Sequence, residues 1–254
     1  MVASQPGIDP IDIVSGNTTI VLRPGGNAIT PRGSLTPDYQ TISSLLGLVQ
    51  YLAKAGVKVV VVPGGVGGHV FADWARHVGC SDAFMNSVGC ALIDLGAQIL
   101  ADQFSRKLAE ADISCPPSAA NNVQELLAYH RAYSVVVCQS GIRGAISSDS
   151  LALLVAGALR SPVLSIKRNV PFREIISALD PGRENSTHNV ALSDIEHFVN
   201  SDDLVGSAGW HHSLDVWALR MLRRPGVALS FTSVKALKHF PESFRLDEVL
   251  RVIT

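Results

Sequence analysis

Two apolar segments of the chain each run directly into a glycine-rich turn, and this repeated pattern constrains the fold more than any other feature. The first segment spans residues 19–22 and reaches Gly25-Gly26 after an Arg-Pro pair. The second spans residues 57–62 and continues into Pro-Gly-Gly-Val-Gly-Gly-His at residues 63–69. Apolar runs bounded by Gly and Pro are typical of buried strands that enter tight turns. We therefore expect two buried strands with glycine turns at their carboxyl ends.

The first turn has the residue types that suit an anion. Gly25 and Gly26 carry no Cβ, so their backbone N–H groups can approach a ligand closely. Arg23 adds a fixed positive charge at the end of the strand, and this combination fits a phosphate group. An ordinary strand–loop junction would also explain an isolated Gly-Gly pair. The second glycine turn, about forty residues later, favours the binding-site interpretation.

Strands and helices alternate along most of the chain. Strands are predicted at residues 19–22, 57–62, 134–138, 162–167 and 226–231, and helices at 41–55, 70–77, 82–108, 122–129, 149–159, 192–199 and 214–222. Residues 172–188 are predicted to be irregular. This alternation indicates an α/β fold, a three-layer αβα sandwich with a mostly parallel central sheet. Ligands of such sheets bind beyond the carboxyl ends of the strands, where both glycine turns would meet.

Composition excludes several classes of function. The 254 residues are 47% hydrophobic, enough for a sizeable core, and 21 Lys and Arg residues face 22 Asp and Glu residues. This balance gives no indication of a nucleic-acid or membrane-surface partner. We find no apolar run of membrane-span length and no secretory signal in residues 1–12. Four cysteines without a C-x-x-C motif predict structural thiols in a reduced, cytoplasmic protein.

Other common site motifs are missing from the sequence. The second glycine turn has no Gly-Lys-Ser/Thr and does not match G-x-G-x-x-G, which argues against a Walker A loop and a nicotinamide dinucleotide site. The hydrolase elbow G-x-S-x-G is absent. The eight histidines show no zinc-ligand spacing and are interpreted as polar or packing residues, so no metal site is predicted from protein ligands.

The order of these segments resembles the amino acid kinase superfamily, and within it the uridylate (UMP) kinase-like branch. Members of that family carry Lys-x-Gly-Gly after the first strand, a glycine-rich acceptor loop after the second, and an Asp-x-x-Ala motif opening a later helix. Here the corresponding segments are Arg23 to Asn27, Gly64 to His69, and Asp149 to Ala152. Asp180-Pro181 resembles a later Asp-Pro of the family, and Asp215 to Ala218 resembles another Asp-x-x-Ala. The resemblance covers nearly the whole chain.

The resemblance implies an ATP-dependent phosphotransferase that uses Mg²⁺ and moves the γ-phosphoryl group to a small phosphate- or carboxylate-bearing acceptor. It implies one domain over residues 1–254, with an acceptor-binding half at about 1–160 and a nucleotide-binding half at about 161–254. It also implies a homo-oligomer. The residues it singles out are Arg23, Asp149 and Lys167 for catalysis; Gly25, Gly26, Asn27, Arg143, Phe172 and Asp180 for ATP and phosphate; and Gly64, Gly65, Gly67, Gly68 and His69 for the acceptor.

Each of these roles has a structural alternative. Asp149 also suits the N-cap of its helix, Phe172 suits core packing, and Arg143 and Lys167 suit solvated loops. Asp73 and Arg76, further acceptor candidates, also suit a mutual ion pair on a helix surface.

The chain departs from the family pattern at two places. Arg23 stands where the family has Lys, and its planar fork does not reproduce the compact donors of an ammonium group. Residues 169–172 stand where relatives have Val-Asp-Gly-Val-Tyr. These departures leave two classes of function open: a specialised small-molecule kinase, or a catalytically degenerate protein that binds a nucleotide or oxoanion for storage or regulation. An unrelated α/β binding protein is a third alternative.

Overall fold

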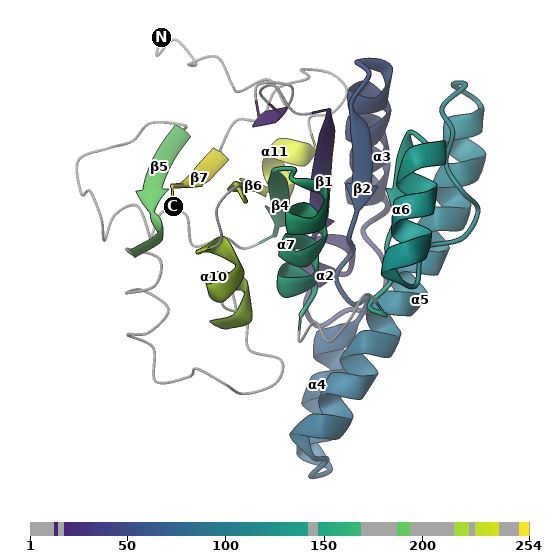
Figure 1. The fold of residues 1–254 in the computed structure, drawn as a ribbon. Coiled ribbons are helices and arrows are strands. Elements are labelled where there is room, and N and C mark those ends of the chain that lie inside the picture. Colours follow the sequence, from purple (N-terminus) through teal and green to yellow (C-terminus); the bar gives the residue numbers. More distant parts are fainter. Residues whose placement is uncertain are drawn as a thin grey trace, which may run out of the picture.

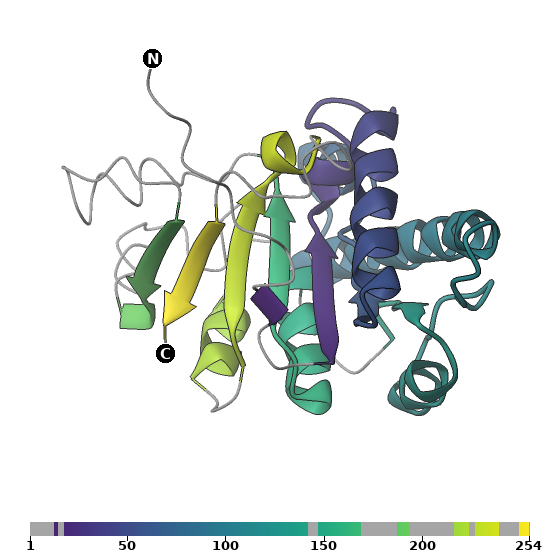
Figure 2. The same cartoon turned by 90° about the horizontal axis from the view of Figure 1, so that it is seen from above.

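In the part of the chain that the structure describes, seven strands form one central sheet. The structure is a computed structural model, and it describes residues 13–14, 18–141, 147–168, 187–193, 216–223, 227–238 and 249–253. The strands are β1 (Thr19–Pro24), β2 (Lys58–Val61), β3 (Val135–Val137), β4 (Val163–Lys167), β5 (Thr187–Ala191), β6 (Leu229–Ser233) and β7 (Val249–Ile253). Their order across the sheet is β3-β2-β1-β4-β6-β7-β5, and Figure 2 shows strands from β5 to β1 side by side.

The sheet is mostly parallel, as the sequence predicts. Every neighbouring pair of strands is parallel except β6 and β7, which run antiparallel. Because β1 lies between β2 and β4, the carboxyl ends of these three strands meet at one edge. The first glycine turn is therefore next to the second turn on one side and to the end of β4 on the other.

Helices cover both faces of the sheet. They are α2 (Gly26–Ile29), α3 (Tyr39–Lys54), α4 (Gly68–His77), α5 (Asp82–Ala109), α6 (Val123–Ala132), α7 (Ser148–Leu159), α10 (Val216–Leu222) and α11 (Val234–Leu237). Figure 1 shows the sheet between α3 and α5 on one side and α7 and α10 on the other, with α4 and the start of α5 projecting beyond the rest. This arrangement confirms the three-layer αβα sandwich.

Alternating side chains of the strands build two separate cores. In β1, Ile20 and Leu22 pack in one core while Val21 packs in the other. The first core includes residues of α3 and α5, and the second includes residues of α6, α7 and α10. Strands buried on both faces explain why these segments are continuous apolar runs rather than alternating ones.

The structure corrects the sequence-based prediction at several elements. No helix was predicted between the strand at residues 19–22 and the helix at 41–55, but α2 forms immediately after Gly25. Strands β5 and β7 and the short helix α11 were not predicted. Strand β5 occupies an edge of the sheet and begins with Thr-His-Asn, and such a polar edge strand lacks the apolar signature that the prediction relied on. Of the predicted helix 192–199, only residues 192–193 are described, and they are helical.

Helix α5 differs from the expectation that no segment has the length and composition of a membrane span. Its 28 residues are long and apolar enough to cross a membrane by those two criteria alone. However, Ala97, Leu100 and Phe104 of α5 are buried in the core beside the sheet. One face of α5 is thus part of the folded domain.

Candidate functional site

The two glycine turns touch each other through their backbones. Gly64 N donates a hydrogen bond to the Pro24 carbonyl at 2.8 Å, and Gly25 N donates to the Ile166 carbonyl at 2.8 Å. A Cβ atom at Gly64 would lie 2.1 Å from Gly26 N, and one at Gly26 would lie 2.4 Å from the Gly65 carbonyl oxygen. No side chain fits between these turns, so glycine is required here for the contact itself.

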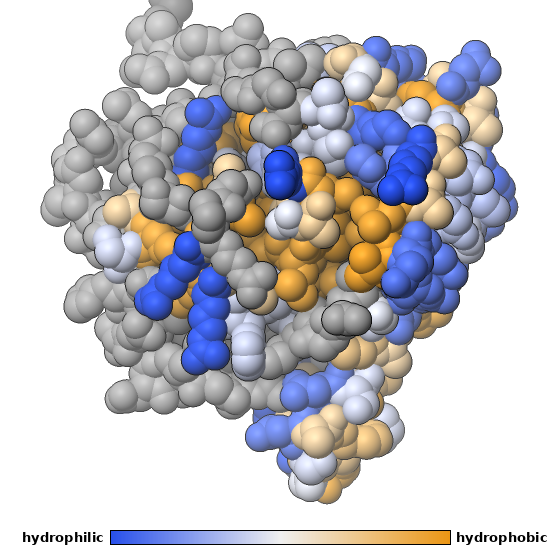
Figure 3. All heavy atoms as spheres, in the orientation of Figure 1, coloured by the Kyte–Doolittle hydropathy of each residue, from blue (hydrophilic) through white to orange (hydrophobic). Residues whose placement is uncertain are grey.

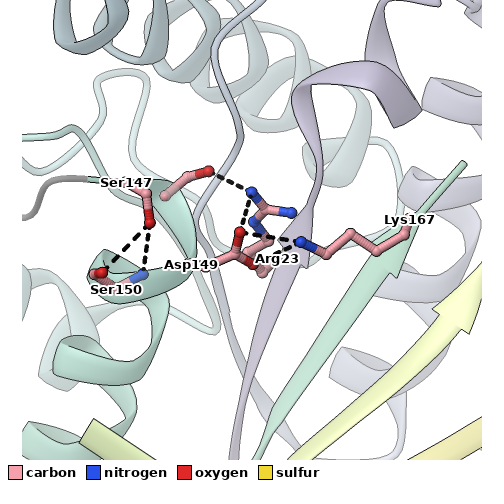
Figure 4. A network of polar contacts seen from close by, with 6 residues as sticks. Arg23, Ser147, Asp149, Ser150 and Lys167 are labelled. Carbon is pink, nitrogen blue, oxygen red and sulfur yellow. Dashed lines mark hydrogen bonds and ion pairs between the residues drawn. The ribbon is translucent and has the colours of Figure 1, made fainter. Parts of the chain in front are cut away.

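A buried charge cluster lies beside the first turn (Figure 4). Arg23, in β1, places Nη2 2.9 Å from Asp149 Oδ2. Lys167, the last residue of β4, places Nζ 2.8 Å from Asp149 Oδ1 and 3.0 Å from Oδ2. The three side chains are only 8%, 12% and 14% exposed for Arg23, Asp149 and Lys167. One carboxylate thus joins two cations that come from neighbouring strands.

The structure separates the two roles considered for Asp149. The N-cap of α7 is Ser147, whose hydroxyl accepts a hydrogen bond from Ser150 N. Asp149 is the second residue of α7, in its first turn, and directs its carboxylate at the two cations. Its position is therefore explained by the charge cluster, because the capping function belongs to Ser147.

Arg23 is held in place on several sides. Its Nη2 also donates to the Ser148 hydroxyl at 2.6 Å, and a Cβ at Gly25 would lie 3.1 Å from its Nη1. The Nε atom is buried and has no hydrogen-bond partner among the residues that the structure describes. A planar guanidinium can contact Ser148 and Asp149 together while lying against the glycine turn, which a lysine ammonium cannot do in the same way.

A second cluster, which the sequence did not reveal, fastens the other side of the first turn. Arg168 donates from Nε to the Asn27 carbonyl at 2.7 Å and from Nη2 to the Ala28 carbonyl at 2.9 Å. The same Nη2 lies 2.6 Å from Asp38 Oδ2, and Lys238 Nζ lies 3.0 Å from that oxygen. Asp38 is also the N-cap of α3. One guanidinium therefore connects the end of β4 to α2 and α3.

The protonation state of Asp38 follows from these contacts. Burial raises the pKa of its carboxyl, but hydrogen bonds from Arg168, Lys238 and the Thr41 backbone outweigh burial and hold the pKa well below the usual range. Asp38 is thus ionised at neutral pH. In the sequence, Asp38 could be recognised only as a capping residue ahead of a predicted helix. Nothing in the sequence linked it to Arg168.

Replacing Arg168 by Met is expected to lower the free energy of unfolding by about 2 kcal/mol, because it removes charge-assisted hydrogen bonds to two carbonyls and to Asp38. The matched control is Lys238→Met, which removes only the second cation of Asp38 and should cost less than about 1 kcal/mol. Urea denaturation of both variants measures the difference. Equal losses would show that the carbonyl contacts of Arg168 contribute nothing to stability.

The second turn is organised around His69. This residue is buried in α4, and its Nε2 accepts a hydrogen bond from Gly33 N at 2.9 Å. The ring is also hydrogen-bonded to the Pro31 backbone, and burial lowers its pKa. His69 is therefore neutral with its proton on Nδ1, and it ties the second turn to residues 31–33. Gly67 has φ +63° and is the N-cap of α4, a left-handed conformation that favours glycine.

The remaining candidates divide into two groups. Asp73 and Arg76 form an exposed mutual ion pair at 2.8 Å, which is the structural alternative considered for them. Arg143, Phe172 and Asp180 lie outside the described residues. Within the described part of the chain, no group of three or more His, Cys, Asp or Glu side chains is arranged to hold a metal ion. The four cysteines are free thiols, and burial raises the pKa of Cys115 to about 12.

Fold and site together define a parallel α/β protein with two abutting glycine turns and a buried carboxylate between two cations. Residues 18–171 match the model of the amino acid kinase family. The chain belongs to this family, and the resemblance inferred from the sequence is confirmed.

Solved structures show the same fold at low sequence identity. Uridylate kinase from Archaeoglobus fulgidus is 16% identical, with a TM-score of 0.58 over 91% of this chain and 99% of that one. UMP kinase from Ureaplasma parvum is 12% identical, with a TM-score of 0.64 over 93% of this chain and 96% of that one. Aspartate kinase from Synechocystis is 17% identical, with a TM-score of 0.56, and the match covers 93% of this chain but 40% of that one. No curated protein sequence matches the chain.

Proposed function

We propose that the protein is an ATP-dependent phosphotransferase that moves the γ-phosphoryl group to a small phosphate- or carboxylate-bearing acceptor. Family membership and the UMP and aspartate kinase neighbours support a phosphotransferase of this family. The observation that carries the proposal is the Asp149 carboxylate bound by both Arg23 and Lys167 beside the two turns.

The arrangement suits phosphoryl transfer because this reaction depends on positioning and charge neutralisation rather than on covalent chemistry. The N–H groups of Gly25 and Gly64, which the sequence suggested for ligand binding, are already bonded to the carbonyls of Ile166 and Pro24. In the proposal, the N–H of Gly26 therefore contacts the phosphates of the donor, and the part of the second turn that follows Gly64 receives the acceptor. Lys167 and Arg23 neutralise the charge that develops on the transferred group, and Asp149 keeps both cations oriented. Asn27, next to the first turn, lies on the donor side.

The residues of this site are compatible with Mg²⁺ only if the phosphates of the nucleotide bind the ion. Both oxygens of Asp149 already contact Lys167, and one of them also contacts Arg23. Mg²⁺ is commonly bound by one or two carboxylates together with substrate phosphates. We therefore propose that the ion arrives with ATP and offsets phosphate charge there, while the residues of this cluster hold and orient the phosphates.

One observation favours the alternative function, a catalytically degenerate protein that binds a nucleotide or oxoanion. The guanidinium of Arg23 is engaged by both Ser148 and Asp149, so it has less freedom to follow a moving phosphoryl group than a lysine would have. The third alternative, an unrelated α/β binding protein, is ruled out by the family match.

The test is transfer of labelled γ-phosphate from ATP to a panel of phosphate- and carboxylate-bearing small molecules, with product detected directly. The wild-type protein is expected to phosphorylate at least one acceptor. Asp149→Asn should lower kcat at least about 100-fold while the thermal shift produced by ATP persists, since it removes the group that orients both cations. If ATP binds, no acceptor is phosphorylated, and Arg23→Lys switches transfer on, the wild-type protein is a binder and not a kinase.

A further inference from the structure

Residues 31–35, the strap, follow α2 in the chain and lie against the second glycine turn. The contact is made through the ring of His69: Gly33 N donates to its Nε2 at 2.9 Å, and the Pro31 backbone is hydrogen-bonded to the same ring. We propose that protonation of His69 releases the strap from the second turn, so that this contact is an acid-sensitive conformational switch. The proposal does not depend on the proposed activity.

The strap has a hydrogen bond of its own that does not involve His69. Ser34 N donates to the Pro31 carbonyl at 3.0 Å, and Gly33 has φ +79°. This is the pattern of a β-turn with glycine at its third position. The N–H group of the third residue takes no part in the internal bond of such a turn, so Gly33 N is available to the ring. We therefore expect the turn to stay formed when it leaves His69.

A proton on Nε2 is incompatible with the closed strap. Nε2 accepts a hydrogen bond from Gly33 N through its lone pair, while Nδ1 donates its proton to the Pro31 carbonyl, since proline has no N–H. In the imidazolium both ring nitrogens are donors, so an N–H of the ring would face the N–H of Gly33. His69 is also buried, at 7% exposure, and a charge there would lose its hydration. The closed strap therefore requires a neutral ring.

The strap makes an apolar contact with the second turn as well, through Leu35. A Cβ atom at Gly67 would lie 2.9 Å from Leu35 Cδ2, so glycine leaves room for this side chain. Leu35 is nevertheless 61% exposed. A side chain that keeps most of its surface in water contributes little stabilisation. The hydrogen bonds of His69 are therefore expected to decide whether the strap stays closed.

The charged groups near the ring do not offer the imidazolium a buried partner. Burial is the largest influence and lowers the pKa of His69; the hydrogen bond to Pro31 and the charge of Asp73 raise the pKa, and the charge of Arg32 lowers it. Asp73 is 59% exposed and already pairs with Arg76 on α4. Figure 3 shows hydrophilic side chains at the surface of the projecting end formed by α4 and the start of α5. The charge of Asp73 is thus screened by solvent.

The direction of the pH effect follows from proton counting. The pKa of His69 lies below 6.5, the ordinary histidine value, in the closed form, whereas in the open form the ring is expected to titrate near that ordinary value. The open form therefore binds more protons. The closed strap is fully stable above the open-form pKa, and its population relative to the open form falls by up to about tenfold per pH unit below it.

Hydrogen exchange of the full chain, followed by NMR without any substrate, measures this opening. The protection factor of Gly33 is the intrinsic exchange rate of its amide divided by the observed rate at the same pH. It is expected to fall about three- to tenfold from about pH 7.5 to about pH 5.5. The protection of Val60, which is buried in the central sheet, should not change. An equal loss at Val60 would assign the effect to unfolding of the domain and overturn the proposal.

Two variants identify the group that titrates. In His69→Gln the side-chain amide can still accept from Gly33 N but does not titrate, so protection of Gly33 should become independent of pH. The matched control is His130→Gln. His130 is another histidine whose pKa is lowered by burial, but its Nε2 pairs with the Thr19 hydroxyl, so the wild-type pH dependence should persist.

The proposal is overturned if the ring of His69 titrates while protection of Gly33 stays constant, or if His69→Gln keeps the wild-type pH dependence. Under the proposed function, an open strap would loosen the turn that receives the acceptor. The exchange experiment uses neither ATP nor an acceptor, so its result is independent of the phosphotransfer test.

Discussion

Asp149→Asn is expected to lower the free energy of unfolding by about 3 kcal/mol, one of the largest effects of any single substitution in the described part of the chain. The amide keeps the size of the carboxylate but removes the negative charge that pairs with Arg23 and Lys167, which are 8% and 14% exposed. Removing one partner of a buried ion pair typically costs about 3–5 kcal/mol. Urea denaturation at neutral pH measures the change.

The matched control for Asp149→Asn is Asp102→Asn. Asp102 pairs with Arg106 on the surface of α5, where the two side chains are 56% and 73% exposed. Losing this pair should cost less than about 0.5 kcal/mol, because solvent screens it. If the two substitutions had similar effects, the charge cluster would be a solvated surface feature.

Gly64→Ala is expected to have a comparable effect through sterics alone. The added methyl group would lie 2.1 Å from Gly26 N and 2.8 Å from Gly26 Cα, which are backbone atoms of a turn fixed by its own hydrogen bonds. The two turns must separate to admit it, at a cost of about 3 kcal/mol. Thermal and urea unfolding measure this cost, and the proposed ATP site should bind more weakly in the same variant.

Gly68→Ala, four residues later, provides the control. A Cβ at Gly68 would have no atom of the described residues within 4 Å, and this residue begins α4. Alanine should therefore be neutral or slightly stabilising there, because it has the higher helix propensity. A loss of stability equal to that of Gly64→Ala would contradict the explanation by close contact between the turns.

The sequence predicted β1, β2, β3, β4 and β6 because these strands are buried on both faces and appear as apolar runs. The resemblance to the family predicted Arg23, Asp149 and Lys167 as site residues, and the structure brings both cations to Asp149. The contact between Gly26 and Gly64 was not foreseen, because glycine in a sequence does not distinguish room for a ligand from room for another backbone.

The Arg168 cluster could not be predicted for a different reason. Asp38 and Arg168 are separated by 130 positions, and neither belongs to a spacing pattern. Their pairing depends on the order of strands in the sheet, which places the end of β4 beside the end of β1. Local patterns of apolar residues do not determine that order.

Lys167 at the end of β4 and the next residue, Arg168, are two consecutive cations that make different contacts. Lys167 contacts the carboxylate of Asp149, whereas Arg168 contacts the backbone of α2 and the cap of α3. The peptide bond between Lys167 and Arg168 thus connects the charge cluster to the contacts that hold α2, just after the first glycine turn. We expect an anion that displaced Lys167 to shift the first glycine turn as well, because the next residue, Arg168, holds the backbone of α2.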